Sequence, residues 1–152
     1  MRPQTVVLGL GLRACAEPAQ LQALWLRAAA LAGITHASLA AIAVLQGKEQ
    51  HPGLRAWLAQ SARALPLHPI APALLAQQAV ASHSPRLQAR YGTGCVAEAA
   101  ALAAAGPGAH LLLARLLADD ASATLALAIP APELQAKTAS NAYQTSASSY
   151  QI

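Results

Sequence analysis

The sequence predicts an α/β protein: a three-layer α/β/α single domain whose mixed sheet has about five strands. Short apolar runs alternate with segments of helical periodicity, which is the pattern of a sheet covered by helices. Hydrophobic residues make up 55% of the 152 residues, with no Phe among them, so small aliphatic side chains must form most of the core. A chain of this length can bury enough surface for one core without disulfides.

The N-terminal half contains the patterns of two strands and two helices. The first strand is residues 5–10, a β-branched and Leu-rich run that ends in glycines, as a buried parallel strand does. Residues 18–31 show helical spacing and stop before Gly33, with an apolar face of Leu21, Leu24, Trp25, Ala28 and Leu31. A second strand is expected over residues 37–45, and Pro52 suits the first turn of a second helix. The inner face of that helix would be Leu54, Trp57, Leu58 and Leu65.

The C-terminal half is predicted to contain two helices and three strands. Residues 66–70 are expected to form a short strand, interrupted by Pro69, and residues 73–81 a helix. An Ala-rich helix follows over residues 96–105, and residues 109–114 and 123–129 are the last two strands. Their connection is short, which implies an antiparallel pair. The loop between them contains Arg115, Asp119 and Asp120.

The end of the chain differs in composition from the rest. From about residue 136 onward Ala, Ser, Thr and Gln dominate, and large apolar side chains are few. Such a segment offers little area to bury. We therefore expect one domain over residues 1–135 and a disordered tail over residues 136–152.

The charge and the cysteine content restrict the classes of binding partner and the cellular compartment that we expect for this protein. The net charge is +4, but the basic residues are scattered singly, without a basic run or an aromatic stacking platform, so nucleic acid is not an expected partner. Isolated arginines fit a small polyanion better, because each can clamp one acid group. The two cysteines lie far apart, as in a reduced cytoplasmic protein. Arg13 interrupts the faint signal-peptide pattern at the N-terminus, and no apolar run is long enough to span a membrane.

A glycine-rich turn over residues 91–95 leads into the Ala-rich helix and its lone acid, Glu98. Thr93 is placed to cap the helix, Gly94 lets a ligand approach the backbone, and the free N–H groups favour an anion. The alternative is an ordinary capping turn in which Glu98 only complements the helix dipole. Cys95 at this position has either a lowered thiol pKa or, as we favour, the role of a small buried hydrophobe.

Three loops are expected to converge beyond the carboxyl ends of the strands, where ligands of such sheets bind. They are residues 9–16, 46–51 and 91–95, and Arg115 would supply a fourth contact.

Taken singly, these loops do not support common enzyme classes. Residues 9–14 match the G-x-G-x-x-A dinucleotide fingerprint, but Gln46 stands at the end of the next strand, where an acid should hold a ribose. Gly47 and Lys48 lack the spacing of a phosphate loop. The five histidines have no metal-ligand spacing, so we expect neither a metal nor another cofactor.

Together and in order, four segments resemble the CobE family of cobalamin biosynthesis, whose module also forms the C-terminal domain of the cobalt-precorrin hydrolase CbiG. The segments are V-L-G-L-G-L-R at residues 7–13, K-E-Q-H-P-G-L at 48–54, G-C-V-A-E-A-A-A-L at 94–102 and A-T-L-A-L-A at 123–128. The resemblance covers about residues 6–129. It implies a corrin precursor as ligand, a macrocycle fringed with acetate and propionate groups.

The resemblance also implies site residues. It assigns Gly9, Gly11 and Arg13 to the first loop, Lys48 to the lysine of a D-x-K-x-x-E pattern, Glu98 to the acid of a G-x-x-S-V-x-E segment, and Arg115 to a basic position before the last strand. With the turn residues Thr93, Gly94 and Cys95, these form the predicted ligand-binding set, and Lys48 and Glu98 are the catalytic candidates. The chain departs from the family pattern at three places, since Gln46 and His51 replace acids and Cys95 replaces a common Ser.

Two functions follow from this resemblance. In the first, the protein is an accessory or carrier protein that binds a precorrin between the other cobalamin-biosynthesis enzymes. In the second, it resembles the cobalt-precorrin-5A hydrolase that opens the ring-A lactone, with Glu98 or Lys48 activating water or polarising the carbonyl. We favour the first, because the hydrolase carries a further N-terminal domain that this chain lacks and Gln46 replaces an acid.

Overall fold

The structure, a computed structural model, describes residues 5–61 and 63–131 and contains the predicted five-stranded mixed sheet. The strand order is β3-β2-β1-β5-β4. β1 (Val6–Leu12), β2 (Leu39–Leu45) and β3 (Leu67–Ile70) are parallel. β5 (Ala123–Ile129) runs antiparallel to β1, and β4 (His110–Leu117) antiparallel to β5. The expected antiparallel pair at the end of the chain is thus confirmed.

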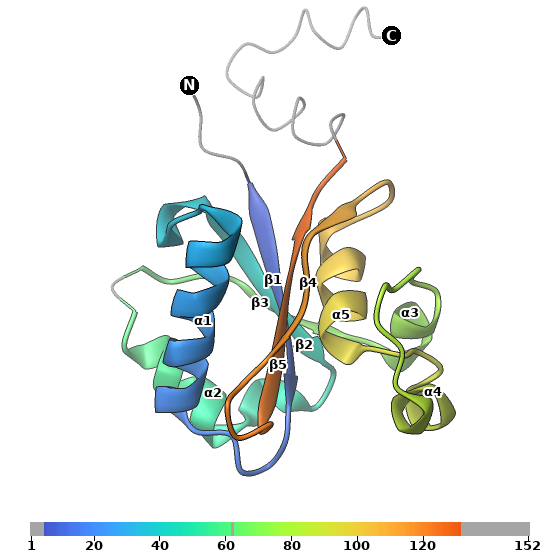
Figure 1. The fold of residues 1–152 in the computed structure, drawn as a ribbon, viewed down its shortest axis with the longest axis horizontal. Helices are drawn as coiled ribbons and strands as arrows, with labels where there is room; N and C mark the ends of the chain where they lie inside the picture. Colours follow the sequence, from blue (N-terminus) through green and yellow to red (C-terminus); the bar gives the residue numbers. More distant parts are fainter. Residues whose placement is uncertain (1–4, 62, 132–152) are drawn as a thin grey trace, which may run out of the picture.

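Helices cover both faces of the sheet and give three layers (Figure 1). α1 (Pro18–Ala32) and α2 (Pro52–Ala59) lie on one face, and α5 (Val96–Ala105) lies on the other. α3 (Pro72–Ala76) and α4 (Pro85–Tyr91) lie on the same side as α5. Two single turns of 3-10 helix, η1 (His36–Ser38) and η2 (Lys48–Gln50), stand before and after β2.

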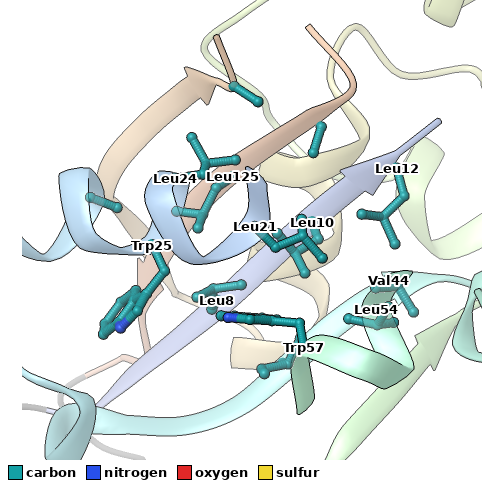
Figure 2. Close-up of a cluster of buried hydrophobic side chains, with 14 of the residues drawn as sticks. Leu8, Leu10, Leu12, Leu21, Leu24, Trp25, Val44, Leu54, Trp57 and Leu125 are labelled. Atoms are coloured by element: carbon teal, nitrogen blue, oxygen red, sulfur yellow. The ribbon is translucent and has the colours of Figure 1, made fainter. Parts of the chain in front are cut away.

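The main core lies between the sheet and the pair α1 and α2 (Figure 2). It is built by alternate residues of the strands and the apolar faces of the two helices. Buried side chains drawn there include Leu8, Leu10, Leu21, Leu24, Trp25, Val44, Leu54, Trp57 and Leu125. On the opposite face the alanines of α5 pack against β1, β2 and β5, so the second layer interface is built from small side chains.

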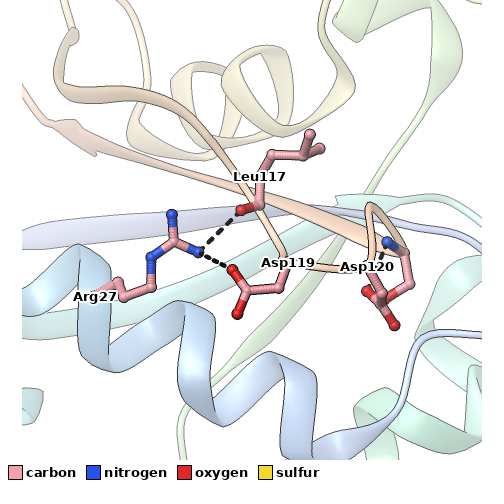
Figure 3. Close-up of polar contacts among 5 residues, drawn as sticks. Arg27, Leu117, Asp119 and Asp120 are labelled. Carbon is pink, nitrogen blue, oxygen red and sulfur yellow. Dashed lines mark hydrogen bonds and ion pairs between the residues drawn. The ribbon is translucent and has the colours of Figure 1, made fainter.

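Two contacts join α1 to the turn between β4 and β5 (Figure 3). The guanidinium of Arg27 donates a hydrogen bond to the main-chain oxygen of Leu117 at 3.0 Å and lies 3.5 Å from the carboxylate of Asp119. Both charged side chains are exposed, so the ion pair contributes little to stability.

Several details of the prediction were wrong. The first helix ends as expected at Gly33, which has a φ of 70°, but Leu31 is 65% exposed and does not belong to the buried face. Leu65 follows α2 instead of lying in it, and β2 starts later than predicted, after η1. The predicted helix over 73–81 stops at Ala76, because Gln77 closes it with a tight turn, and α4 was missed. The predicted tail, residues 136–152, lies outside the described part of the chain.

Candidate functional site

The ends of the segments predicted to form the site meet at one edge of the sheet, but the first of them was placed too early. Gly9 and Gly11 lie inside β1, where both pair with β5, so only residues 13–16 of the predicted loop over 9–16 leave the sheet. β1 and β2 are parallel, so residues 13–16 and 46–51, which follow them, leave the sheet at the same edge. α5 also begins there, because a Cβ added to Gly11 would lie 3.8 Å from the main-chain nitrogen of Ala97 in its first turn. This edge, at the bottom of Figure 1, is called the carboxyl edge below.

The two glycines of the first motif serve packing. A Cβ added to Gly9 would lie 2.1 Å from the main-chain oxygen of Ala97 and 2.7 Å from the nitrogen of Ala101. A Cβ added to Gly11 would lie 2.5 Å from the hydroxyl of Thr124. The structure therefore explains Gly9 by the close approach of the α5 backbone and Gly11 by the Thr124 side chain of β5, whereas their ligand-binding role stays a prediction.

His51 fixes the backbone of the loop that carries Arg13. The Nδ1 atom of His51 accepts hydrogen bonds from the main-chain N–H groups of Gly53 at 3.0 Å and Leu54 at 3.3 Å, which caps α2. This assigns the ring proton to Nε2, which then donates to the main-chain oxygen of Arg13 at 2.7 Å. A Cβ on Gly53 would lie 2.2 Å from the oxygen of Ala16, so only glycine fits beside the same loop. The Arg13 side chain is exposed at the carboxyl edge.

Lys48 lies in η2, directly after β2, and its side chain is half-buried. The turn before it is held by Glu49, whose carboxylate accepts the main-chain N–H of Gly47 at 2.6 Å. Gly47 has a φ of 102°, a conformation that favours glycine.

Glu98 is fully buried, and protein groups occupy its whole carboxylate. Oε1 accepts hydrogen bonds from the main-chain N–H groups of Ala81 and Ser82, both at 2.8 Å. Oε2 accepts from the Ser82 hydroxyl at 2.7 Å and from the main-chain N–H of Arg115 at 2.8 Å. A carboxylate has about four acceptor sites, and all of them are used here.

These contacts decide the charge of Glu98. Burial alone would raise the pKa of the carboxyl, but the hydrogen bonds from Arg115, Ser82 and Ala81 outweigh burial and lower it. Glu98 is therefore ionised at neutral pH, and no acceptor site remains for a water molecule or ligand.

The turn before α5 differs from the prediction at Thr93 and agrees with it at Cys95. The N-cap of α5 is Cys95, and the hydroxyl of Thr93 instead accepts the N–H of Cys95 at 3.4 Å, so Thr93 does not cap the helix. Cys95 is 1% exposed. Burial raises the pKa of its thiol, although the N–H groups of Glu98 and Ala97 favour the thiolate. The role of a small buried residue is thereby confirmed for Cys95.

Gly94 is buried against the segment between α3 and α4. Its main-chain oxygen accepts the N–H of Ser84 at 2.8 Å, and an added Cβ would lie 2.6 Å from the Cα of His83. The glycine therefore lets this segment close over the first turn of α5, and a ligand can reach the backbone of Gly94 only if the segment moves.

Arg115 lies inside β4, not in the predicted loop. Its main chain is held by Glu98 and its side chain is exposed. The guanidinium is close enough to Cys95 to lower the thiol pKa in part, against the larger effect of burial. The main chain of Arg115 thus lies against the first turn of α5, through its hydrogen bond to Glu98.

The three predicted cations share one property. Within residues 5–61 and 63–131, no acid forms an ion pair with Arg13, Lys48 or Arg115. The ion pair in these ranges joins Arg27 and Asp119. The charges of the three predicted cations remain available to an anionic ligand.

Sequence reasoning did not identify two residues that organise this edge. His51 stands directly before Pro52, and this position at a helix start is a detectable sign of a cap. Ser82 has no such signal, because its partner Glu98 lies sixteen residues further along the chain.

A cavity of about 720 Å³ lies elsewhere, between α1 and α2 near the amino ends of β2 and β3. Both tryptophans, Trp25 and Trp57, line it, together with Leu39 and Leu67. No residue of the predicted site contributes to its wall.

Two features are absent from the described residues. No group of three or more His, Cys, Asp or Glu side chains is arranged to hold a metal ion. None of the helices has the length and apolar character needed to cross a membrane.

The fold and the site define a small α/β domain whose cations at the carboxyl edge of the parallel strands have no acidic partner among the described residues. Residues 6–128 match the family model described as the cobalamin synthesis G C-terminus, and the chain belongs to this family. It is thus a protein of cobalamin biosynthesis. No curated protein matches the chain.

Solved structures agree with this assignment. The chain is similar to CobE, a protein from the cobalamin (vitamin B12) biosynthetic pathway, at 36% identity over 84% of this chain and 92% of that one, with a TM-score of 0.71. It is also similar to the cobalamin biosynthesis protein chiG from Agrobacterium tumefaciens str. C58, at 30% identity over 83% and 98% of the two chains, with a TM-score of 0.62. A putative cobalamin biosynthesis protein G homolog from Sulfolobus solfataricus shares the fold at 15% identity and a TM-score of 0.64, over 84% of this chain and 37% of that one.

Proposed function

We propose that the protein binds a corrin-ring precursor, a precorrin, as an accessory or carrier protein of cobalamin biosynthesis. Arg13, Lys48 and Arg115 would pair with the acetate and propionate groups at the rim of the macrocycle. The support from the structure is that these three cations have no acidic partner within the described ranges and stand around the carboxyl edge. An exposed cation can clamp a ligand carboxylate at little cost, because no internal ion pair has to break.

The burial and hydrogen bonding of the Glu98 carboxylate are the observations that favour binding over hydrolysis. A general base must reach the proton that it removes, directly or through one water molecule. The Glu98 carboxylate is sealed from solvent and already accepts four hydrogen bonds. Because its pKa is lowered, it is also a weak base. The acid of the family motif thus lacks what lactone hydrolysis would require, and Lys48 would be left to polarise a carbonyl alone.

The proposal is tested by incubating the pure protein with a panel of precorrins and cobalt-precorrins. A carrier shifts the absorbance spectrum of one of them in proportion to protein and leaves its mass unchanged. A hydrolase resembling the cobalt-precorrin-5A enzyme adds the mass of one water molecule when the lactone opens. If the folded protein changes neither spectrum nor mass for any member of the panel at low salt, the proposed function is wrong.

A further inference from the structure

The Glu98 carboxylate joins three segments that are distant in the sequence. The acid comes from the first turn of α5, two donor residues come from the segment between α3 and α4, and the third donor comes from β4. All four hydrogen bonds are 2.7 or 2.8 Å long, as expected for bonds to an ionised acceptor.

The contact with β4 occurs at an irregularity of the strand. Leu113 pairs with Leu127 and Leu116 with Leu125, so three steps along β4 correspond to two along β5. Such a bulge frees a main-chain group from the ladder and re-aims the neighbouring side chain. The N–H of Arg115, inside this bulge, is bonded to Glu98 instead of to β5.

The bulge also fixes the main chain from which the exposed Arg115 side chain extends. Its guanidinium acts electrostatically on Cys95, the N-cap of α5, although the two residues are twenty positions apart in the sequence. Glu98 is three residues from Cys95 and holds the backbone of Arg115. One buried acid in the first turn of α5 thus fixes the main chain from which this cation extends.

We propose that Glu98 is a positioning residue, which fixes the β4 bulge through the main chain of Arg115 and so aims the guanidinium at a carboxylate of the ligand. This inference rests on the proposed function for the identity of the ligand. Glu98 itself does not touch the ligand in this arrangement.

The substitution Glu98→Gln tests the charge with little change of shape. The amide of Gln would present N–H groups to one of the protein donors, so at least one of the four hydrogen bonds must break. Glu49→Gln is the matched control, because it removes the same charge from a carboxylate that also accepts a main-chain N–H, that of Gly47.

Affinity for uroporphyrin III, a tetrapyrrole with a carboxylate fringe, is measured by absorbance titration in a double-mutant cycle. In the otherwise native protein, Arg115→Gln should weaken binding about fivefold, as expected for one exposed ion pair. In the Glu98→Gln background, Arg115→Gln should change the affinity less than twofold, because the guanidinium is no longer held in place. Lys48→Met should weaken binding by the same factor in both backgrounds. Equal effects of Arg115→Gln in both backgrounds would overturn the proposal.

Amide hydrogen exchange provides a readout that does not depend on a ligand. The Arg115 and Ser82 amides should be protected in the native protein and in Glu49→Gln, and should exchange faster in Glu98→Gln. If uroporphyrin III does not bind the native protein, the proposed function loses its support and this readout alone decides the role of Glu98. If the Arg115 amide is as well protected in Glu98→Gln as in the native protein, Glu98 does not position Arg115.

If Glu98→Gln does not fold, Glu98→Asp is used in its place. The shorter Asp side chain keeps the charge but cannot reach all three donor residues.

Discussion

Glu98 and Cys95 lie three residues apart at the start of α5, and both are sealed from solvent, yet their ionisation is shifted in opposite directions. Burial favours the neutral form of both groups. For Cys95 burial dominates and raises the thiol pKa, whereas for Glu98 four hydrogen bonds outweigh burial and lower the carboxyl pKa. The number of donors, not the depth of burial, separates the two.

The two thiols should react at very different rates. Cys15 is exposed and Cys95 is buried with a raised pKa, so a thiol reagent such as Ellman's reagent should modify one thiol in the native protein. The second should react only after unfolding in denaturant. In a Cys15→Ala variant the native protein should be almost unreactive, and fast labelling of that variant would show that the start of α5 opens readily.

Stability should depend on pH through Glu98. Because the folded-state pKa of Glu98 is below its unfolded value, its contribution is complete above the unfolded pKa of about 4.3 and is lost as pH falls through the folded value. Glu98→Gln should lower the free energy of unfolding by about 2 kcal/mol at pH 7. The difference between variant and native protein should shrink in acid. Urea unfolding at pH 7 and at lower pH measures both, and a constant difference would contradict an ionised, hydrogen-bonded Glu98.

At the scale of single elements, the packing of α5 depends on small residues in β1. Gly9 lets the backbone of the helix approach the strand, because even one methyl group there would overlap with Ala97 and Ala101. The G-x-G pattern therefore has a structural explanation in this protein, distinct from the nucleotide-binding use of a similar motif.

Gly9→Ala should be strongly destabilising. The added methyl group meets backbone and cannot be relieved by a side-chain rotation, so we expect a loss of about 3 kcal/mol or more. Gly47→Ala is the control, because its Cβ would have no neighbour within 4 Å and only its φ of 102° is strained. That variant should lose about 1 to 2 kcal/mol. Chemical denaturation measures the free energy of unfolding of both variants. If Gly9→Ala and Gly47→Ala lose the same amount, α5 does not pack against β1 as closely as described.

The cap of α2 gives a second prediction at this scale. His51→Ala removes the acceptor for two N–H groups and the link to Arg13, and should cost about 1 to 2 kcal/mol. His51→Asp restores an acceptor at the helix start and should recover part of this loss. Thermal melting of the three proteins checks the order. If Asp is no better than Ala, the link to Arg13, and not the cap, is the main contribution of His51.

For the whole molecule, the feature that bears on function is the group of cations at the carboxyl edge, which have no acidic partner within residues 5–61 and 63–131. Binding of a carboxylate-rich tetrapyrrole should weaken as salt rises, because exposed pairs are screened within about 10 Å at 0.1 M and about 3 Å at 1 M ionic strength. Lys48→Met, which keeps the aliphatic stem, should bind more weakly and show a shallower salt dependence than the native protein. Titrations of uroporphyrin III at several salt concentrations measure both. Affinity independent of salt would mean that these cations do not hold the ligand.

The parts of the fold that the sequence predicted best have strong local signals. The helix up to Gly33 and the helix over residues 96–105 were placed correctly because periodicity and glycine stops mark them. The helix predicted over residues 73–81 runs too far beyond α3, since this Ala-rich stretch shows no local break at Gln77, and α4 was not predicted at all. The lengths of short helices are decided by what they pack against.

The sequence by itself determined the fold class, the antiparallel pairing of the last two strands and the family, because alternating patterns, loop lengths and the spacing of motifs are properties of the chain alone. Only the tertiary structure decided the roles of the site residues. The donors of Glu98 lie up to 17 residues away and the partner of His51 lies 38 residues away. Burial and hydrogen bonding between such distant segments set the charge of Glu98, bury the thiol of Cys95 and fix the backbones of Arg13 and Arg115. No local pattern encodes these contacts, since each exists only after the chain has folded.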